Sequence, residues 1–246
     1  MAARLPVSRT FVPYSGSRYN GLMSNQAFLS VWCRDFPEDQ IVNRLDMFLA
    51  TIPFSASRPG IDRITVRAID SAESPLVEQD ARALPVEIAG AIEMIAGYVH
   101  GDCAYEFHCY WDLAVFDADT AKFKTEPRPM EALCHGEDYD DGFWRENGHF
   151  QLCLGFEHLF TGHAGLLGST RGANASAANR EEARFLEVMA WPENIEQYQE
   201  RTRENIRKLL AWTERIATAV PLERIRLWSE GEEDFEARME DILAVG

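Results

Sequence analysis

One stretch of alternating residues, 103–116, carries side chains that could perform acid–base or metal chemistry. Its apolar and polar residues alternate with the period of two that is typical of a β-strand. The polar face presents a carboxylate, an imidazole, a phenol and a second carboxylate in a row: Glu106, His108, Tyr110 and Asp112. Side chains two residues apart on one strand face lie roughly 7 Å apart, which is close enough to share a substrate or a proton network. Glu106 and His108 are therefore the candidate acid and base, although a solvated sheet face shows the same alternation.

A second candidate site lies in the glycine-rich segment 148–168, which holds three of the six histidines of the chain. The candidate metal ligands there are one carboxylate and three imidazoles: His149, Glu157, His158 and His163. Neutral imidazoles combined with a carboxylate suit zinc or another borderline divalent ion. The segment therefore predicts a metal site, with histidines that cap, hydrogen-bond or lie exposed as the alternative.

The spacing of these ligands limits the metal hypothesis. His158 and His163 are five residues apart, which places them on different faces of either a helix or a strand, so only an irregular glycine-bearing loop could bring them together. If the predicted strand 149–156 pairs beside 103–116, His149 would join Glu106 and His108.

The charge of the chain is strongly acidic, with 40 acidic and 24 basic residues and a formal net charge of −16. An acidic surface repels phosphate backbones and anionic lipids, so no nucleic-acid or membrane partner is expected. Residues 101–150 contain twelve acidic and four basic residues and so carry half of the net charge. A localised negative surface of this kind is suited to a basic protein partner, or it serves solubility alone.

The acidic run at 136–142 does not match a calcium-binding loop. Such a loop needs oxygen ligands at positions 1, 3 and 5 and a glutamate at position 12. Counted from Asp138, position 5 is Gly142 and position 12 is His149. The run is therefore interpreted as a solvated acidic loop.

The compartment is expected to be the cytoplasm, with the protein soluble. No stretch approaches the roughly 18 consecutive apolar residues of a membrane-spanning helix, and the first residues lack the apolar core of a secretory signal. The five cysteines include no C-x-x-C pair, which indicates reduced core thiols over disulfides or a thiolate metal site.

Hydrophobic periodicity predicts an α+β fold, with a mixed, largely antiparallel sheet, helices packed on one of its faces and a helical C-terminal region. Apolar alternation predicts strands at 26–33, 63–69, 103–116 and 149–156, and spacings of three and four predict helices at 38–50 and 85–99. Residues 123–133 are a weaker strand candidate, placed at an edge or in an irregular segment because of Pro127 and Pro129.

The chain divides into four predicted segments. They are an extended lead-in (1–25), an α+β domain (26–167), a small-residue linker (168–179) and a helical C-terminal region (180–246) that stands apart or packs on the α+β domain as one unit. The last segment contains a long amphipathic helix at 193–220 whose apolar seam is narrow enough for a coiled coil.

Three functional hypotheses follow from these patterns. The favoured one is a soluble, acidic binding protein without catalytic activity that docks a basic protein and needs no cofactor. The alternative is a metal-dependent hydrolase or lyase that uses the 149–163 cluster and a divalent metal such as zinc. The third is an oligomeric scaffold, such as a homodimer, assembled through the 193–220 helix.

Overall fold

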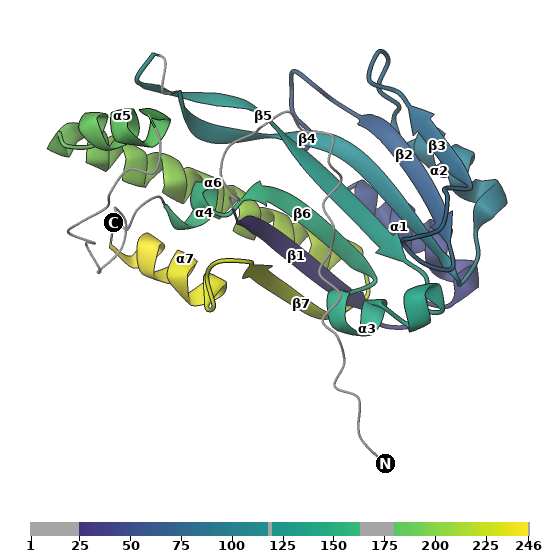
Figure 1. The fold of residues 1–246 in the computed structure, drawn as a ribbon. Coiled ribbons are helices and arrows are strands. Elements are labelled where there is room, and N and C mark those ends of the chain that lie inside the picture. Colours follow the sequence, from purple (N-terminus) through teal and green to yellow (C-terminus); the bar gives the residue numbers. More distant parts are fainter. Residues whose placement is uncertain (1–24, 118–119, 163–179, 246) are drawn as a thin grey trace.

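The structure, a computed structural model, describes residues 25–117, 120–162 and 180–245 (Figure 1). Within these residues a single antiparallel sheet of seven strands has the order β3-β2-β4-β5-β6-β1-β7. The strands are β1 (Gln26–Cys33), β2 (Ile61–Ala68), β3 (Val77–Asp80), β4 (Cys103–Asp117), β5 (Lys122–His135), β6 (Phe150–Phe156) and β7 (Leu222–Ser229).

The helices occur between and after the strands. They are α1 (Ile41–Leu49), α2 (Ile88–Ile95), α3 (Trp144–Asn147), α4 (His158–Thr161), α5 (Arg180–Val188), α6 (Pro192–Ala219) and α7 (Phe235–Ala244), and short 3₁₀ turns cover Glu38–Gln40, Ala96–Tyr98 and Tyr139–Asp141. The α+β prediction is confirmed. None of the described helices has both the length and the apolar character needed to cross a bilayer.

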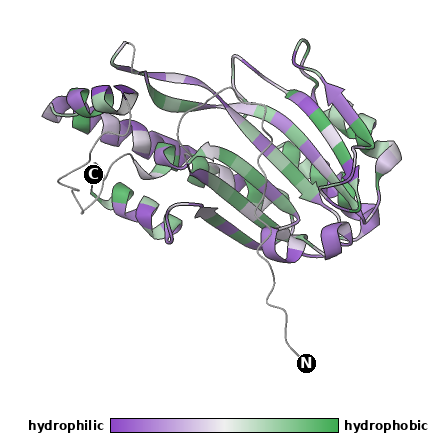
Figure 2. Cartoon of the chain, in the orientation of Figure 1, coloured by the Kyte–Doolittle hydropathy of each residue, from purple (hydrophilic) through white to green (hydrophobic). Residues whose placement is uncertain are grey.

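The core lies between one face of the sheet and helices α1, α2, α4, α6 and α7 (Figure 1). The odd-numbered residues of β4 from Tyr105 to Leu113 are at most 1% exposed, whereas the even-numbered residues from Glu106 to Asp112 are half-buried. Figure 2 shows this alternation as stripes along the strands. The predicted split of β4 into an apolar and a polar face is therefore confirmed, and it orients His108 away from the helices.

Strand β5 corrects the prediction of an edge or irregular segment at 123–133. It lies inside the sheet, because β4 pairs with it over its whole length and β6 pairs with it on the other side. The prolines remain compatible with this position because β6 pairs only with Glu131–Cys134, so Pro127 and Pro129 lie where one side of β5 has no strand partner among the described residues. A missing proline N–H breaks no ladder there.

The C-terminal part of the chain contributes to the same sheet and core. Strand β7 pairs with β1, and α6 packs against β4, α4 and α7. Within the apolar seam of α6, Ile206, Leu209 and Ile216 are fully buried in this chain. A homodimer formed through α6 would therefore have to use another face of the helix. The predicted linker, 168–179, lies outside the described residues.

Replacing Gly148 by alanine is expected to destabilise the protein by about 2 kcal/mol. Gly148 has φ +95°, and a Cβ there would lie 2.8 Å from the Val31 nitrogen and 2.9 Å from the Val31 oxygen, both of which are backbone atoms. Gly97→Ala is the control, since an added Cβ meets nothing within 4 Å there. Urea denaturation of both variants tests the expectation, and equal stabilities would contradict it.

Candidate functional site

The candidate site lies on the face of the sheet opposite the helices, where three adjacent strands bring polar side chains into one row. Strand β4 supplies Glu106 and His108, which are two residues apart and so share a face. The sheet register places Arg63 of β2 on one side of His108 and Glu131 of β5 on the other. Directly opposed residues of antiparallel strands point to the same side of the sheet, so these four side chains converge.

The four side chains are in direct contact, and we call them the His108 cluster. The Nε2 atom of His108 lies 2.7 Å from Glu106 Oε1 and 2.9 Å from Glu131 Oε1. A guanidinium nitrogen of Arg63 contacts the same imidazole nitrogen and lies 3.8 Å from Glu106 Oε1. The side chains are 15–22% exposed, so the cluster is mostly buried and still open to solvent at its outer side.

Burial and charge act in opposite directions on the cluster. Burial alone would raise the pKa of Glu106, but hydrogen bonds with His108 and Glu131 outweigh it and lower that pKa to about 2. Burial likewise opposes the charged form of His108, yet the two carboxylates raise its pKa to about 9. Burial raises the pKa of Glu131 above its ordinary range. A proton is therefore held at the centre of the cluster at neutral pH.

The chemistry available to this arrangement is proton transfer or cation binding. Glu106, His108 and Glu131 each offer one ligand atom, and these atoms all lie within 4.8 Å of one another. In the part of the chain that the structure describes, no other group of three histidine, cysteine or acidic side chains meets this condition.

The other two polar residues predicted on this face of β4 do not join the cluster. The guanidinium carbon of Arg58 lies over the ring of Tyr110, 3.5 Å from the centroid of that ring. Asp112 accepts a hydrogen bond of 3.0 Å from the Ala56 backbone N–H. Both side chains therefore hold the segment that precedes β2, and only Glu106 and His108 converge.

His149 has a different environment from the one that the sequence suggested. Strand β5 separates β6 from β4, so the condition under which His149 would join Glu106 and His108, direct pairing of strand 149–156 with 103–116, is not met. Its ring is stacked between Phe36 and Trp144. Its Nδ1 accepts a 3.0 Å hydrogen bond from the Cys33 N–H, and burial lowers its pKa to about 4.

The remaining members of the predicted metal set lie apart in the described structure. Glu157 accepts a hydrogen bond of 3.0 Å from the Gly231 N–H, and His158 stacks on Phe156. His149, Glu157 and His158 do not form a group that meets the ligand-distance condition. His163 lies outside the described residues, so the complete four-ligand set stays a prediction.

A second feature gathers at the end of the sheet where β2 and β5 end and β4 begins (Figure 1). We call it the acidic rim, and it consists of Glu38, Asp70, Asp102, Glu137, Asp138, Asp140 and Asp141. The loops that carry it are joined by hydrogen bonds. Gly101 N–H donates to Glu38 Oε2 (2.8 Å), and the backbone bonds are Asp138 N–H to Gly101 O (2.9 Å), Ile69 N–H to Asp102 O (2.8 Å) and Asp140 N–H to Ile69 O (2.7 Å).

The backbone of these loops is strained. Positive φ angles occur at Ile69 (72°), Asp140 (46°) and Asp141 (55°). Aspartate tolerates this region, whereas a β-branched isoleucine rarely adopts it. Strain of this kind costs about 1–3 kcal/mol and persists only where surrounding contacts impose it, which the hydrogen bonds on both sides of Ile69 do. The Ile69 side chain is 60% exposed beside the rim carboxylates.

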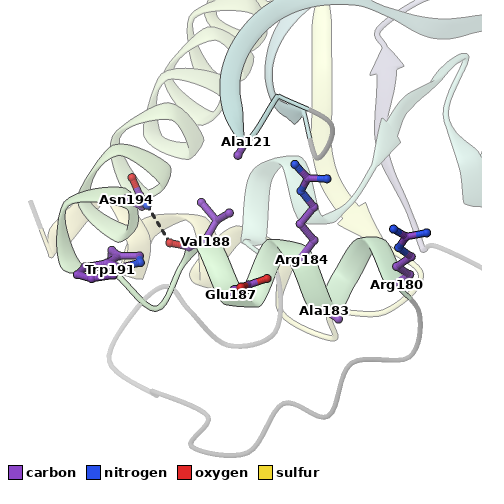
Figure 3. A pocket seen from close by; sticks show the side chains of 8 residues that line it. All are labelled: Ala121, Arg180, Ala183, Arg184, Glu187, Val188, Trp191 and Asn194. Atoms are coloured by element: carbon purple, nitrogen blue, oxygen red, sulfur yellow. Dashed lines mark hydrogen bonds between the residues drawn. The ribbon is translucent and has the colours of Figure 1, made fainter.

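A pocket lies elsewhere, between α5, the start of α6 and Ala121 (Figure 3). Its volume is about 710 Å³. Its charged lining residues, Arg180, Arg184 and Glu187, are exposed on α5, and Asn194 donates to the Val188 carbonyl at 2.9 Å. None of the residues of the His108 cluster or the acidic rim lines it.

No family model, curated protein or solved structure matches this chain. The chemistry and geometry of the site, and not similarity to known proteins, are therefore the basis for the function of this protein.

Proposed function

We propose that this protein is a binding protein whose acidic rim docks a basic protein partner. The observation that carries the proposal is the convergence of seven carboxylates from four separate loops on one end of the sheet, in loops that hydrogen-bond to one another. Four of these residues are already neighbours in the run 137–141, and folding brings Glu38, Asp70 and Asp102 to the same end of the sheet.

Few cations balance these carboxylates locally. Arg67 and Arg145 donate to the backbone carbonyls of Glu73 and Asp141. The His100 imidazole lies 2.8 Å from Asp102 Oδ1 and 3.8 Å from Glu38 Oε2. The rim therefore keeps a net negative field, which steers a basic partner toward it and speeds association at low salt.

The fixed loop geometry adds to the electrostatic attraction. Loops held by hydrogen bonds lose little conformational freedom on binding, so more of the interaction energy appears as affinity. Ile69, an exposed apolar side chain whose backbone is hydrogen-bonded to the backbones of Asp102 and Asp140, adds an apolar contact of the kind found in protein interfaces. The acidic rim thus combines electrostatic attraction for a basic partner, loops of fixed conformation and one exposed apolar side chain.

Neutralising three exposed rim residues, with Glu137→Gln, Asp138→Asn and Asp141→Asn combined, is expected to weaken binding of a lysine decapeptide about tenfold at low salt. The matched control carries Glu193→Gln, Glu196→Gln and Glu214→Gln on the exposed side of α6. Both variants change the net charge of −16 by the same three units. Fluorescence anisotropy across a salt series measures the difference.

The two variants separate a localised docking surface from a general charge effect. The proposal expects the α6 control to bind within about twofold of the unaltered protein. Equal losses in both variants would mean that only net charge matters and would refute the proposal. Circular dichroism of each variant establishes that the comparison is between folded proteins.

A further inference from the structure

We propose that Glu106, His108 and Glu131 form a three-ligand site for a borderline divalent cation, zinc in the first place, with Arg63 as a competing cation. This inference is independent of the acidic rim. It moves the predicted metal chemistry from segment 148–168 to strands β4 and β5.

The donor set and its placement suit such an ion. Two carboxylate oxygens already approach one imidazole nitrogen, at 2.7 Å for Glu106 and 2.9 Å for Glu131, and the three ligand atoms all lie within 4.8 Å of one another. Zinc bonds to nitrogen and oxygen are near 2.0–2.2 Å, so the ligand atoms of a tetrahedral site are about 3.4 Å apart. The two carboxylate oxygens must move away from the nitrogen to reach this separation, and rotation of the Glu106 and Glu131 side chains allows this without movement of the strands.

The crowding around one atom points to a cation. His108 Nε2 can carry a single proton, yet both carboxylate oxygens approach it. One N–H cannot make two full hydrogen bonds, whereas a divalent ion in its place satisfies both oxygens and the nitrogen together. Binding of the ion releases the His108 proton, so the charge of the cluster rises by one, and the carboxylates of Glu106 and Glu131 offset it.

Substitution of Arg63 distinguishes a metal site from a network of ion pairs that involves protein side chains alone. Its guanidinium contacts the imidazole nitrogen that the metal would bind. It must therefore turn aside, and the long arginine side chain on β2 is able to do so. Removing its charge should favour the metal, whereas in a purely internal network the same change only removes a partner of Glu106.

Three protein ligands leave a fourth position of a tetrahedral ion for water or for an oxygen atom of a bound molecule. The side chains of the cluster are 15–22% exposed, so this position faces solvent. The molecule expected to bind the zinc ion at this fourth position is therefore a small oxygen donor that reaches it from solvent.

The test uses the full chain freed of metal by chelation and titrated with zinc chloride by calorimetry at about pH 8. We expect one ion per chain and an affinity that rises about tenfold per pH unit between pH 7 and 9, because the ion displaces the proton of His108. Cobalt chloride serves as a second probe, since its visible absorption reports a nitrogen- and oxygen-bound four-coordinate site.

The zinc affinities of single-residue variants identify the side chains that bind the ion. His108→Gln and Glu131→Gln are expected to lose at least tenfold in zinc affinity, and Arg63→Gln to gain several-fold. Glu126→Gln is the matched control on the same strand, because Glu126 pairs with Lys124 and Arg128 and not with the cluster. If the ligand variants fail to fold, the gain expected from Arg63→Gln still tests the site.

Three results would overturn the inference. They are the absence of stoichiometric zinc binding at about pH 8, zinc affinity unchanged by Glu131→Gln in a folded protein, and an Arg63→Gln variant that binds zinc no more tightly than the unaltered chain.

Discussion

Replacing Asn205 by leucine is expected to lower the free energy of unfolding by about 4 kcal/mol. Asn205 lies on α6, is 2% exposed and joins three elements through its amide. Its Oδ1 accepts from the Ala114 N–H at 2.8 Å, and its Nδ2 donates to the carbonyls of Ala114 at 3.0 Å and Leu159 at 3.1 Å. Leucine has a similar volume but satisfies none of these groups.

The size of this effect follows from where Ala114 lies in the sheet. The pairing of β2 with β4 ends at the Ile61–Cys109 pair, so Ala114 has no β2 partner on that side. Asn205 takes the place of the missing strand and completes the ladder. Each buried backbone group left without a partner costs about 1–3 kcal/mol, and here one N–H and two carbonyls are affected.

Urea denaturation followed by fluorescence measures this loss. Asn43→Leu, on the exposed side of α1, is the control and is expected to change the stability by less than about 0.5 kcal/mol. A loss below about 1 kcal/mol for Asn205→Leu would mean that water replaces the amide and that the bridge contributes little.

The second large effect is a pH-dependent loss of stability on replacing His108 by glutamine in the metal-free protein. Folding raises the pKa of His108 from its ordinary 6.5 to about 9. A raised pKa contributes stability that is fully present below pH 6.5 and is lost as the pH rises through 9. A shift of this size corresponds to about 3 kcal/mol.

The pKa of Glu106, the carboxylate partner of His108, sets the lower limit of the pH range in which the cluster stabilises the fold. The pKa of Glu106 falls from its ordinary 4.5 to about 2 on folding, so its contribution is present above pH 4.5 and is lost as the pH falls toward 2. The stability difference between the unaltered protein and His108→Gln should therefore be greatest between about pH 4.5 and 6.5 and shrink by pH 9.

Denaturation at a series of pH values, with a chelator present, tests this expectation. His100→Gln is the matched control, because His100 also has a carboxylate partner, Asp102, but its side chain is 64% exposed and is screened by solvent. A difference between the unaltered protein and His108→Gln that stays constant from pH 5 to 9 would show that His108 is neutral in the folded protein.

Part of the candidate site could be predicted from the sequence because strand alternation is a local property. Apolar residues at odd positions of 103–116 identified the buried face, and Glu106 and His108 followed as neighbours on the other. Glu131 and Arg63 could not be found in this way. Their places beside His108 depend on strand register, which is set by long-range pairing.

His149 is a second case in which local sequence could not predict the environment of a side chain. The sequence around His149 predicts a metal ligand, yet the environment of His149 comes from Phe36 and Trp144, and Phe36 is distant in the chain. Composition alone could not distinguish an imidazole held between aromatic rings from one that binds a metal. Packing makes that distinction, because burial favours the neutral ring.

The sequence by itself determined the fold class, five of the seven described strands, the helices α1, α2 and α6, the faces they bury and the acidity of the chain, because periodicity and composition act locally. Only the tertiary structure decided that β5 lies inside the sheet, that Arg63 and Glu131 meet His108, and that the rim carboxylates of four loops gather at one end. These features depend on contacts between residues far apart in the chain. Such contacts form when the strands pair in one register and the helices cover one face, and no local pattern specifies them.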